Sequence, residues 1–270
     1  MSTMVEHSAA PPQSMAQIRR VGFQTIVIRE FHRIVRIWSQ TILPSGVTAT
    51  LYFLIFGAVI GSRLGPMEGI SYMTYIAPGL IMQAVILNSY NNVVSSFFGA
   101  KFGKHLEELL VAPLPNWLIV LGYALGGVTR GFLVGTVVTI VSLFFTRLGV
   151  LHPLLIVSAA FLTSFVFALG GFINAMLAKN FDQISWFPTF ILTPLTYLGG
   201  VFYSIRMLPR WALEASHANP ILYMVSAFRY GFLGTADIDL RLAYAIMVIA
   251  AVGMFSLAVA LMNRGVGIRD

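Results

Sequence analysis

A small number of strongly polar side chains stand inside apolar stretches of this chain. Asn88 and Asn92 belong to one such stretch, and Arg130 belongs to another. Amides donate and accept hydrogen bonds, so both asparagines could join neighbouring helices or contact a ligand. A guanidinium group only donates, and no acidic residue lies near Arg130 in the sequence. We therefore expect Arg130 either to hold a structural hydrogen bond or to bind an anionic group.

The chain lacks the sequence patterns of catalysis and nucleotide binding. A phosphate-binding loop needs a glycine, four residues and then Gly-Lys-Ser/Thr. Gly103 and Lys104 approach this pattern, but Phe98 replaces the first glycine and His105 replaces the hydroxyl residue. The histidines are dispersed, and neither His-Glu-x-x-His nor Gly-x-Ser-x-Gly occurs. The sequence predicts no catalytic, metal or cofactor site in this chain.

Composition indicates an integral membrane protein. Of 270 residues, 57% are hydrophobic and 10% are charged, and the mean hydropathy is +0.82, whereas soluble domains carry about 25% charged residues. Apolar runs near the length that crosses a bilayer predict six spans, at about 42–60, 73–97, 117–145, 154–177, 184–203 and 243–262. The segment 211–233 is interpreted as re-entrant or interfacial, because its polar residues disfavour a seventh span.

Positive residues predict the orientation. With six spans, all of the lysines (Lys101, Lys104 and Lys179) fall on one side together with most arginines of the two termini, so we expect both termini in the cytoplasm. The formal net charge of +7 is then explained by topology and by contact with anionic membrane lipids. No basic stripe with interleaved aromatics indicates a nucleic-acid partner.

The residues before the first span predict an amphipathic helix on the inner membrane surface. The apolar residues Val27, Phe31, Ile34, Val35 and Trp38 recur at helical spacing, while Arg29, Arg33 and Arg36 occupy a different arc.

Every Asp and Glu falls in a predicted loop, terminus or interfacial segment. Ion-coupled transporters bury acidic residues in their spans, so this distribution disfavours a gradient-driven transporter, which stays the alternative.

Two further patterns concern packing and docking. The loop after the second span predicts a short amphipathic helix within 101–112, which is either a solvated surface helix or a docking element for a cytoplasmic partner. Its apolar side carries Phe102, Leu106, Leu109 and Leu110, and its polar residues are Lys101, Lys104, His105, Glu107 and Glu108. In the third span, glycines four residues apart (Gly122 and Gly126; Gly127, Gly131 and Gly135) predict close helix packing, within the chain or across a dimer.

The stretch 186–234 is apolar but repeatedly broken. Proline removes a backbone donor, and paired glycines favour bends, so a straight span is not expected here. The breaking residues are Pro188, Pro194, Gly199, Gly200, Pro209 and Pro220. Irregular backbone at membrane depth must be covered by protein or line a water-filled cavity, which predicts a functional segment.

The ordered set of motifs resembles the type-2 permease family of ABC transporters over roughly 20–265. The motifs are the arginine-bearing helix, Glu-Glu-Leu-Leu-Val-Ala-Pro at 107–113, Pro-Leu-Thr-Tyr-Leu-Gly-Gly-Val-Phe-Tyr at 194–203, Leu-Pro-Arg-Trp at 208–211, Asn-Pro-Ile-Leu-Tyr at 219–223 and Phe-Arg-Tyr-Gly-Phe-Leu-Gly at 228–234. The resemblance implies an all-helical, six-span permease domain at 18–265 in the bacterial inner membrane. Residues 1–17 have no counterpart in the family pattern, and their polar composition predicts a disordered tail, while 266–270 would be a cytoplasmic tail.

The resemblance also implies partners and site residues. It implies a dimer with a second permease protomer, and two copies of a separate ATPase subunit that binds ATP and magnesium. Residues 101–112 would be the coupling helix, with Glu107 and Glu108 at its acidic positions. Residues 211–233 would be an extracytoplasmic re-entrant hairpin. The gate region would then include Pro194, Gly199, Gly200, Pro209, Trp211, Pro220 and Arg229, and family members mostly export polysaccharides, lipids or drugs.

Overall fold

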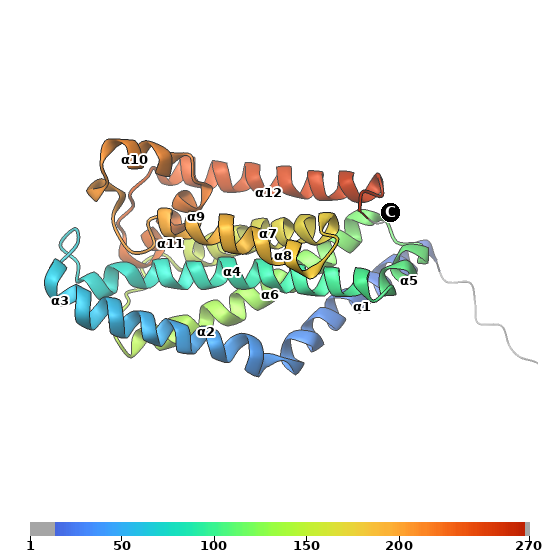
Figure 1. The fold of residues 1–270 in the computed structure, drawn as a ribbon, viewed down its shortest axis with the longest axis horizontal. Coiled ribbons are helices and arrows are strands. Elements are labelled where there is room, and N and C mark those ends of the chain that lie inside the picture. The colour runs from blue at the N-terminus through green and yellow to red at the C-terminus, as the bar shows by residue number, and fades with distance from the viewer. Residues whose placement is uncertain (1–13, 268–270) are drawn as a thin grey trace, which may run out of the picture.

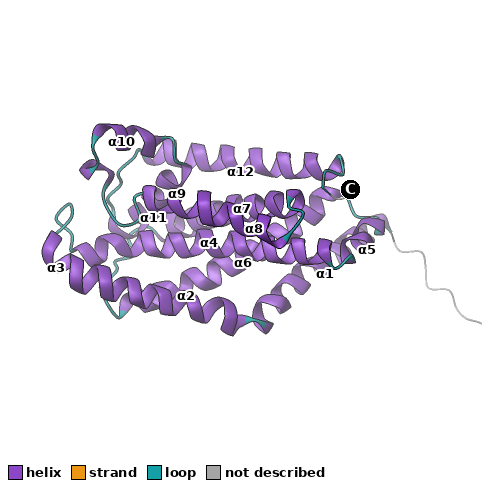
Figure 2. Ribbon diagram, in the orientation of Figure 1, coloured by secondary structure: helices purple, strands orange, loops and turns teal. Residues whose placement is uncertain are grey.

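The computed structural model describes residues 14–267 as a helical bundle, shown in Figures 1 and 2. Within these residues the extended structure is limited to a single bridge between Met67 and Ile70. The elements are α1 (Met15–Arg36), α2 (Trp38–Tyr52), π-helix η1 (Phe53–Ile60), α3 (Gly61–Leu64), α4 (Tyr72–Phe102), α5 (His105–Val111), α6 (Asn116–Leu143), α7 (Pro153–Leu177), α8 (Phe181–Phe187), π-helix η2 (Pro188–Leu192), α9 (Thr193–Leu198), 3-10 helix η3 (Ile205–Met207), α10 (Arg210–His217), α11 (Pro220–Leu233) and α12 (Leu240–Asn263).

The centre of the bundle is formed by α4, α6 and α7, which pack directly on one another. Glycines of α6 permit this approach, because a Cβ at Gly127 would lie 2.6 Å from the Ala168 Cβ of α7 and 2.9 Å from the Ser89 carbonyl of α4. On another face of α6, a Cβ at Gly122 would meet Ile26 of α1. The close packing predicted from the glycine spacing therefore occurs within one chain.

Four helical segments of the described residues are long and apolar enough to cross a membrane. They are Trp38–Gly57, Asn116–Leu143, Pro153–Leu177 and Leu240–Asn263. The two other predicted spans correspond to α4, which is long but carries several amides, and to the interrupted series α8, η2 and α9. These four segments indicate an all-helical, multi-pass membrane protein.

The segment 211–233 forms two helices. Pro209 is the N-cap of α10 and Pro220 opens α11, so each proline begins a helix where its missing N–H costs nothing. Helix α10 is exposed along one side, with Trp211 75% exposed, whereas most residues of α11 are buried against the bundle. The 14 residues of α11 extend only about 21 Å, too short for a seventh span.

Helix α1 packs one side against the rest of the protein. Its buried residues are Ile26, Glu30 and Ile34, one turn apart, whereas Phe31 and Trp38 of the predicted apolar face are about half exposed. The side of α1 that faces the protein therefore contains a carboxylate. Helix α1 begins at Met15, inside the predicted polar tail at 1–17. Residues 1–13 of that tail and residues 268–270 of the predicted C-terminal tail lie outside the described residues.

The two ends of the bundle carry different elements. The start of α1, α5 and the C-terminal end of α12 lie at one end in Figure 1, and α3 and α10 lie at the other. We call them the α5 end and the α10 end.

Candidate functional site

One face of α4 lines a series of polar cavities. Leu80, Ala84, Leu87, Asn91 and Ser95 follow helical spacing along this face. A cavity of about 300 Å³ lies against α2, and a second of about 540 Å³ lies against α8 and η2. Both share Leu87, Asn91 and Arg130, so they are parts of one space.

A third cavity lies next along the bundle, toward the α5 end. It has a volume of about 460 Å³ and is lined by Arg29, Glu30, His32, Arg33, Arg36, Ser96 and Ala100. It shares no lining residue with the first two cavities, and the hydrogen bond from Arg33 Nη1 to the Ser95 hydroxyl, at 3.3 Å, lies between it and the second cavity. We call the three cavities together the polar groove. Leu80 to Ala100 extends about 30 Å along α4, which is about the thickness of the hydrocarbon core of a bilayer.

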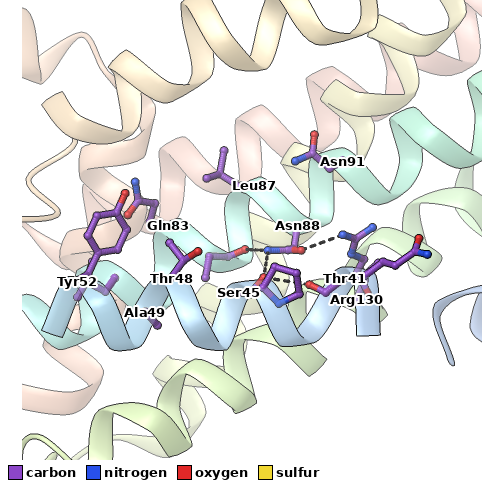
Figure 3. A pocket seen from close by; sticks show the side chains of 14 residues that line it. Thr41, Ser45, Thr48, Ala49, Tyr52, Gln83, Leu87, Asn88, Asn91 and Arg130 are labelled. Carbon is purple, nitrogen blue, oxygen red and sulfur yellow. Dashed lines mark hydrogen bonds between the residues drawn. The ribbon is translucent and has the colours of Figure 1, made fainter. Parts of the chain in front are cut away.

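Asn88 and Arg130, two of the polar residues within apolar stretches of the sequence, meet in the middle of the polar groove (Figure 3). Arg130 Nη2 donates to Asn88 Oδ1 at 3.1 Å, and Asn88 Nδ2 donates to the Ser45 hydroxyl of α2 at 3.2 Å. Within the described part of the chain, the Arg130 Nε is buried and has no hydrogen-bond partner. No described acidic residue lines either of the two cavities that share Arg130. Arg130 thus has a polar neighbour and an unneutralised charge.

Asn92 does not join this pair, although it lies one turn after Asn88. It is fully buried and belongs to a cluster around Glu30, whose side chain is 1% exposed. Arg33 Nη2 lies 3.2 Å from Glu30 Oε2 and donates to Asn92 Oδ1 at 2.7 Å, while Ser96 donates to Glu30 Oε1. The cluster fixes α1 to α4. Glu30 stands in α1, the helix predicted to be interfacial, and its carboxylate faces the protein rather than solvent, which the arginines on either side of it in the sequence did not indicate.

Aromatic side chains close the groove toward the α10 end. The hydroxyls of Tyr52 on α2 and Tyr197 on α9 lie 3.4 Å apart. The Phe202 ring packs on both, with ring centroids 5.7 Å from Tyr52 and 5.6 Å from Tyr197. The two walls of the groove therefore meet at this end.

A buried ion pair braces the α10 end beside this closure. Arg229 of α11 and Asp237 are each 1% exposed, with 2.9 Å between Nη1 and Oδ2. Arg229 also donates to the Gly200 carbonyl at 2.5 Å and to the Tyr75 hydroxyl at 3.1 Å. Gly200 has a φ of +71°, which explains why glycine stands at this turn. The pair thus connects α4, the turn after α9, and α11.

The family follows from a comparison with known sequences. A profile of the family described as ABC-2 type transporter matches residues 21–233. The chain belongs to the ABC-2 type transporter family. The resemblance seen in the motifs is confirmed, and the matched range includes all three cavities of the polar groove.

This ABC-2 permease is similar to several named bacterial proteins over most of its length. It is 51% identical over 256 residues to inner membrane transport permease YadH of Escherichia coli K12, covering 95% of this chain and 100% of that protein. It is 25% identical over 228 residues to nodulation protein J of Rhizobium leguminosarum bv. viciae, with 83% and 87% covered. Similarity to nodulation protein J of Sinorhizobium fredii is 27% over 219 residues, with 80% and 82% covered. The name of the Escherichia coli relative and the apolar helices together support a multi-pass protein of the inner membrane.

The predicted coupling segment of this ABC-2 permease ends α4 and forms α5. Lys101 and Phe102 belong to α4, and Lys101 Nζ donates to the carbonyls of Met176 and Ala178 at 2.8 and 2.7 Å, at the end of α7. Lys104, with a φ of +59°, makes the corner into α5. The apolar residues do not form one buried side, because Leu106 is 4% exposed while Phe102 is 65% exposed. The exposed polar residues are Lys104, His105, Glu107 and Glu108, and Leu109 is half-buried.

The predicted gate residues separate into two groups. Gly199, Gly200 and Arg229 come together, and Pro194 begins α9 beside them. Trp211 lies apart on the exposed α10, Pro209 is the N-cap of that helix, and Pro220 begins α11. Sequence reasoning missed Glu30, Asp237 and the Tyr52–Tyr197 contact. The Arg229–Asp237 pair could have been found from the sequence, because the two opposite charges stand eight residues apart on either side of Gly234 and Thr235. The other contacts join residues distant in sequence.

Proposed function

We propose that this ABC-2 permease is the membrane subunit of an ATP-driven exporter, and that its ligand crosses the membrane along the polar groove. The groove carries this proposal, because a series of polar cavities spread over about 30 Å of α4 is costly in an apolar bundle unless it is used. The spans would be six: the four apolar segments, α4 as the floor of the groove, and α8 to α9 as one wall.

The two walls of the groove support a homodimer. On α2, Leu43, Val47 and Leu51 are each more than half exposed, and on the opposite wall Trp186 and Phe190 are 55% and 64% exposed. A second protomer that covers these walls would enclose the groove and turn it into a path between two copies. The Tyr52–Tyr197 contact would then be the gate at the outer side.

The α5 end would be cytoplasmic, and α5 would receive the ATPase. The topology predicted from the sequence places most arginines of α1 and all of the lysines on the same side of the membrane as α5. A cytoplasmic α5 end therefore agrees with the positive-inside rule. The exposed Phe102, Glu107 and Glu108 offer a mixed apolar and acidic surface to a partner. Movement of α5 would reach the groove through α4, which carries both.

Two measurements test this proposal. The full-length chain purified from native membranes should bring an ABC ATPase subunit with it, in equal numbers of the two subunits. Proteoliposomes of that complex should export a lipid, glycan or hydrophobic compound only with ATP and magnesium. Transport driven by an ion gradient without ATP would instead support the secondary transporter, for which the buried Glu30 is the one favourable observation.

A further inference from the structure

The charges that line the polar groove are strongly one-sided. The cavity at the α5 end contains Arg29, Arg33 and Arg36 against Glu30, and the two cavities beyond it contain Arg130 with no described carboxylate. Arginine therefore exceeds acid at both levels of the groove. The excess extends from the α5 end to the middle of α4.

Glu30 does not neutralise this excess. Its carboxylate is already bound by Arg33, Asn92 and Ser96, and it lies 3.9 Å from Arg29. Arg29 and Arg130 bond otherwise to neutral groups, the Tyr123 hydroxyl and the Asn88 amide. One carboxylate cannot balance three arginines at the α5 end, and none lines the cavities around Arg130, so an excess of positive charge remains for a ligand at both levels. A guanidinium matches the oxygens of a phosphate better than any other side chain.

The walls of the groove constrain the rest of the ligand. Polar residues line the space itself, among them Ser45, Thr48, Gln83, Asn91 and Thr189. The outward faces of both walls are apolar, with Val47 on one and Phe190 on the other. A ligand with a polar head and a hydrocarbon tail fits this arrangement, with its head inside the groove and its tail along the apolar walls.

We propose that the ligand of the polar groove is an amphiphile with a net negative phosphate-ester headgroup, bound first by Arg29 and Arg36 and then by Arg130. This inference rests on the proposed function and names its substrate class. It excludes neutral and cationic amphiphiles as preferred ligands. Arg130 has a binding role here, beyond its hydrogen bond to Asn88.

Lipid retention by the full-length protein tests the proposal. The chain in neutral detergent is exposed to phosphatidylglycerol or to phosphatidylcholine, and bound lipid is counted by native mass spectrometry. We expect a preference for phosphatidylglycerol that falls about tenfold in Arg130→Gln and is largely kept in Arg130→Lys. Arg147→Gln, an exposed arginine outside the groove, is the matched control and should change nothing.

A second variant covers the case in which Arg130→Gln does not fold. Asn88→Asp keeps the size of the side chain and places a carboxylate at the position that now lies 3.1 Å from Arg130, so it should remove the preference by neutralising the guanidinium. Inorganic phosphate serves as a competitor without a tail and should not displace the lipid at millimolar concentration. Equal retention of both lipids by the wild type, an unchanged preference in Asn88→Asp, or full displacement by inorganic phosphate would overturn the proposal. ATPase co-purification is independent of these outcomes and tests the proposed function separately.

Discussion

Two acidic residues of this protein are buried to the same extent but hold different kinds of contact. Asp237 forms a close pair with one arginine in a turn at the α10 end, supported by the Ser204 hydroxyl at 3.0 Å. Glu30 shares its charge among two arginines, an amide and a hydroxyl between α1 and α4. Both carboxylates also accept from neutral groups, but the arginine that pairs with Asp237 is buried, whereas the side chains of the two arginines near Glu30 are 47% and 25% exposed and can be solvated. The two sites should therefore respond differently to neutral substitutions.

Asp237→Asn should destabilise the protein strongly. The change leaves the Arg229 guanidinium buried without a counter-charge, and removal of one member of a buried pair costs about 3–5 kcal/mol. The measurement is the melting temperature of the purified protein in detergent. Asp239→Asn, which alters an exposed residue two positions along the chain, should shift it little. A melting temperature unchanged by Asp237→Asn would show that the pair contributes nothing to stability.

Side-chain contacts set the limit of what the sequence could predict at this scale. Arg130 stood out because a charge within an apolar run is costly wherever the helix faces, and its expected polar neighbour is Asn88. Glu30 did not stand out, because it is flanked by Arg29 and Arg33, and helical spacing alone does not tell which arc faces protein. The tyrosines at the end of the groove are 145 positions apart and meet only in the folded chain.

At the scale of elements, helix contacts depend on a few positions without side chains. Gly127 of α6 faces Ala168, Val93 and the Ser89 carbonyl, so three helices converge on it. Gly253 of α12 has no atom within 4 Å of its ideal Cβ position. The spacing of glycines predicted close packing, but it carries no information about which helix approaches which glycine.

Gly127→Ala should separate the central helices and lower stability by about 1–3 kcal/mol, the usual cost of overpacking. Gly253→Ala, in the open interior of α12, should raise stability by up to about 1 kcal/mol because alanine favours the helix. Thermal unfolding of the two variants side by side checks both signs. If both substitutions were stabilising, the close approach at Gly127 would not exist in the membrane-embedded protein.

Helix α5 should bind the ATPase through its exposed acidic residues. The double variant Glu107→Lys, Glu108→Lys should lose most of the co-purified ATPase while the chain remains folded, because both side chains are exposed. Glu214→Lys, a single charge reversal of the same type on exposed α10 at the opposite end of the bundle, is the control and should keep the ATPase. Quantitative immunoblotting of the purified complex measures the ratio. Retention of the ATPase by the double variant would assign α5 to the solvated surface instead.

At the scale of the whole molecule, apolar helices surround the polar groove. Composition and apolar runs predicted the membrane class and the order of the elements, because burial in lipid demands length and apolarity. They did not predict the two-helix form of 211–233 or the polar groove, since both depend on how α4 and α11 face their neighbours. The lack of cysteine in the sequence makes the topology directly measurable.

Single cysteines should be labelled from opposite sides of the membrane. Lys104→Cys, at the α5 end, should react with a membrane-impermeant maleimide only in inside-out vesicles, and Trp211→Cys, on exposed α10, only in right-side-out vesicles or intact spheroplasts. Both positions are exposed, so accessibility is not limited by folding. Ile249→Cys, an exposed residue in the middle of the apolar α12, should react in neither. Labelling of Lys104→Cys and Trp211→Cys from the same side would contradict an arrangement with the two ends on opposite faces.

The π-helical turn at Pro188–Leu192 has a consequence for the phase of the helix that follows it. The Thr193 N–H bonds to the Pro188 carbonyl five residues back, so this turn holds one residue more than an α-helical turn. Each residue of an α-helix advances about 100° around the axis. The extra residue therefore sets the direction in which α9 presents Tyr197, and removal of one residue from this turn would rotate that hydroxyl away from Tyr52 while both helices kept their length.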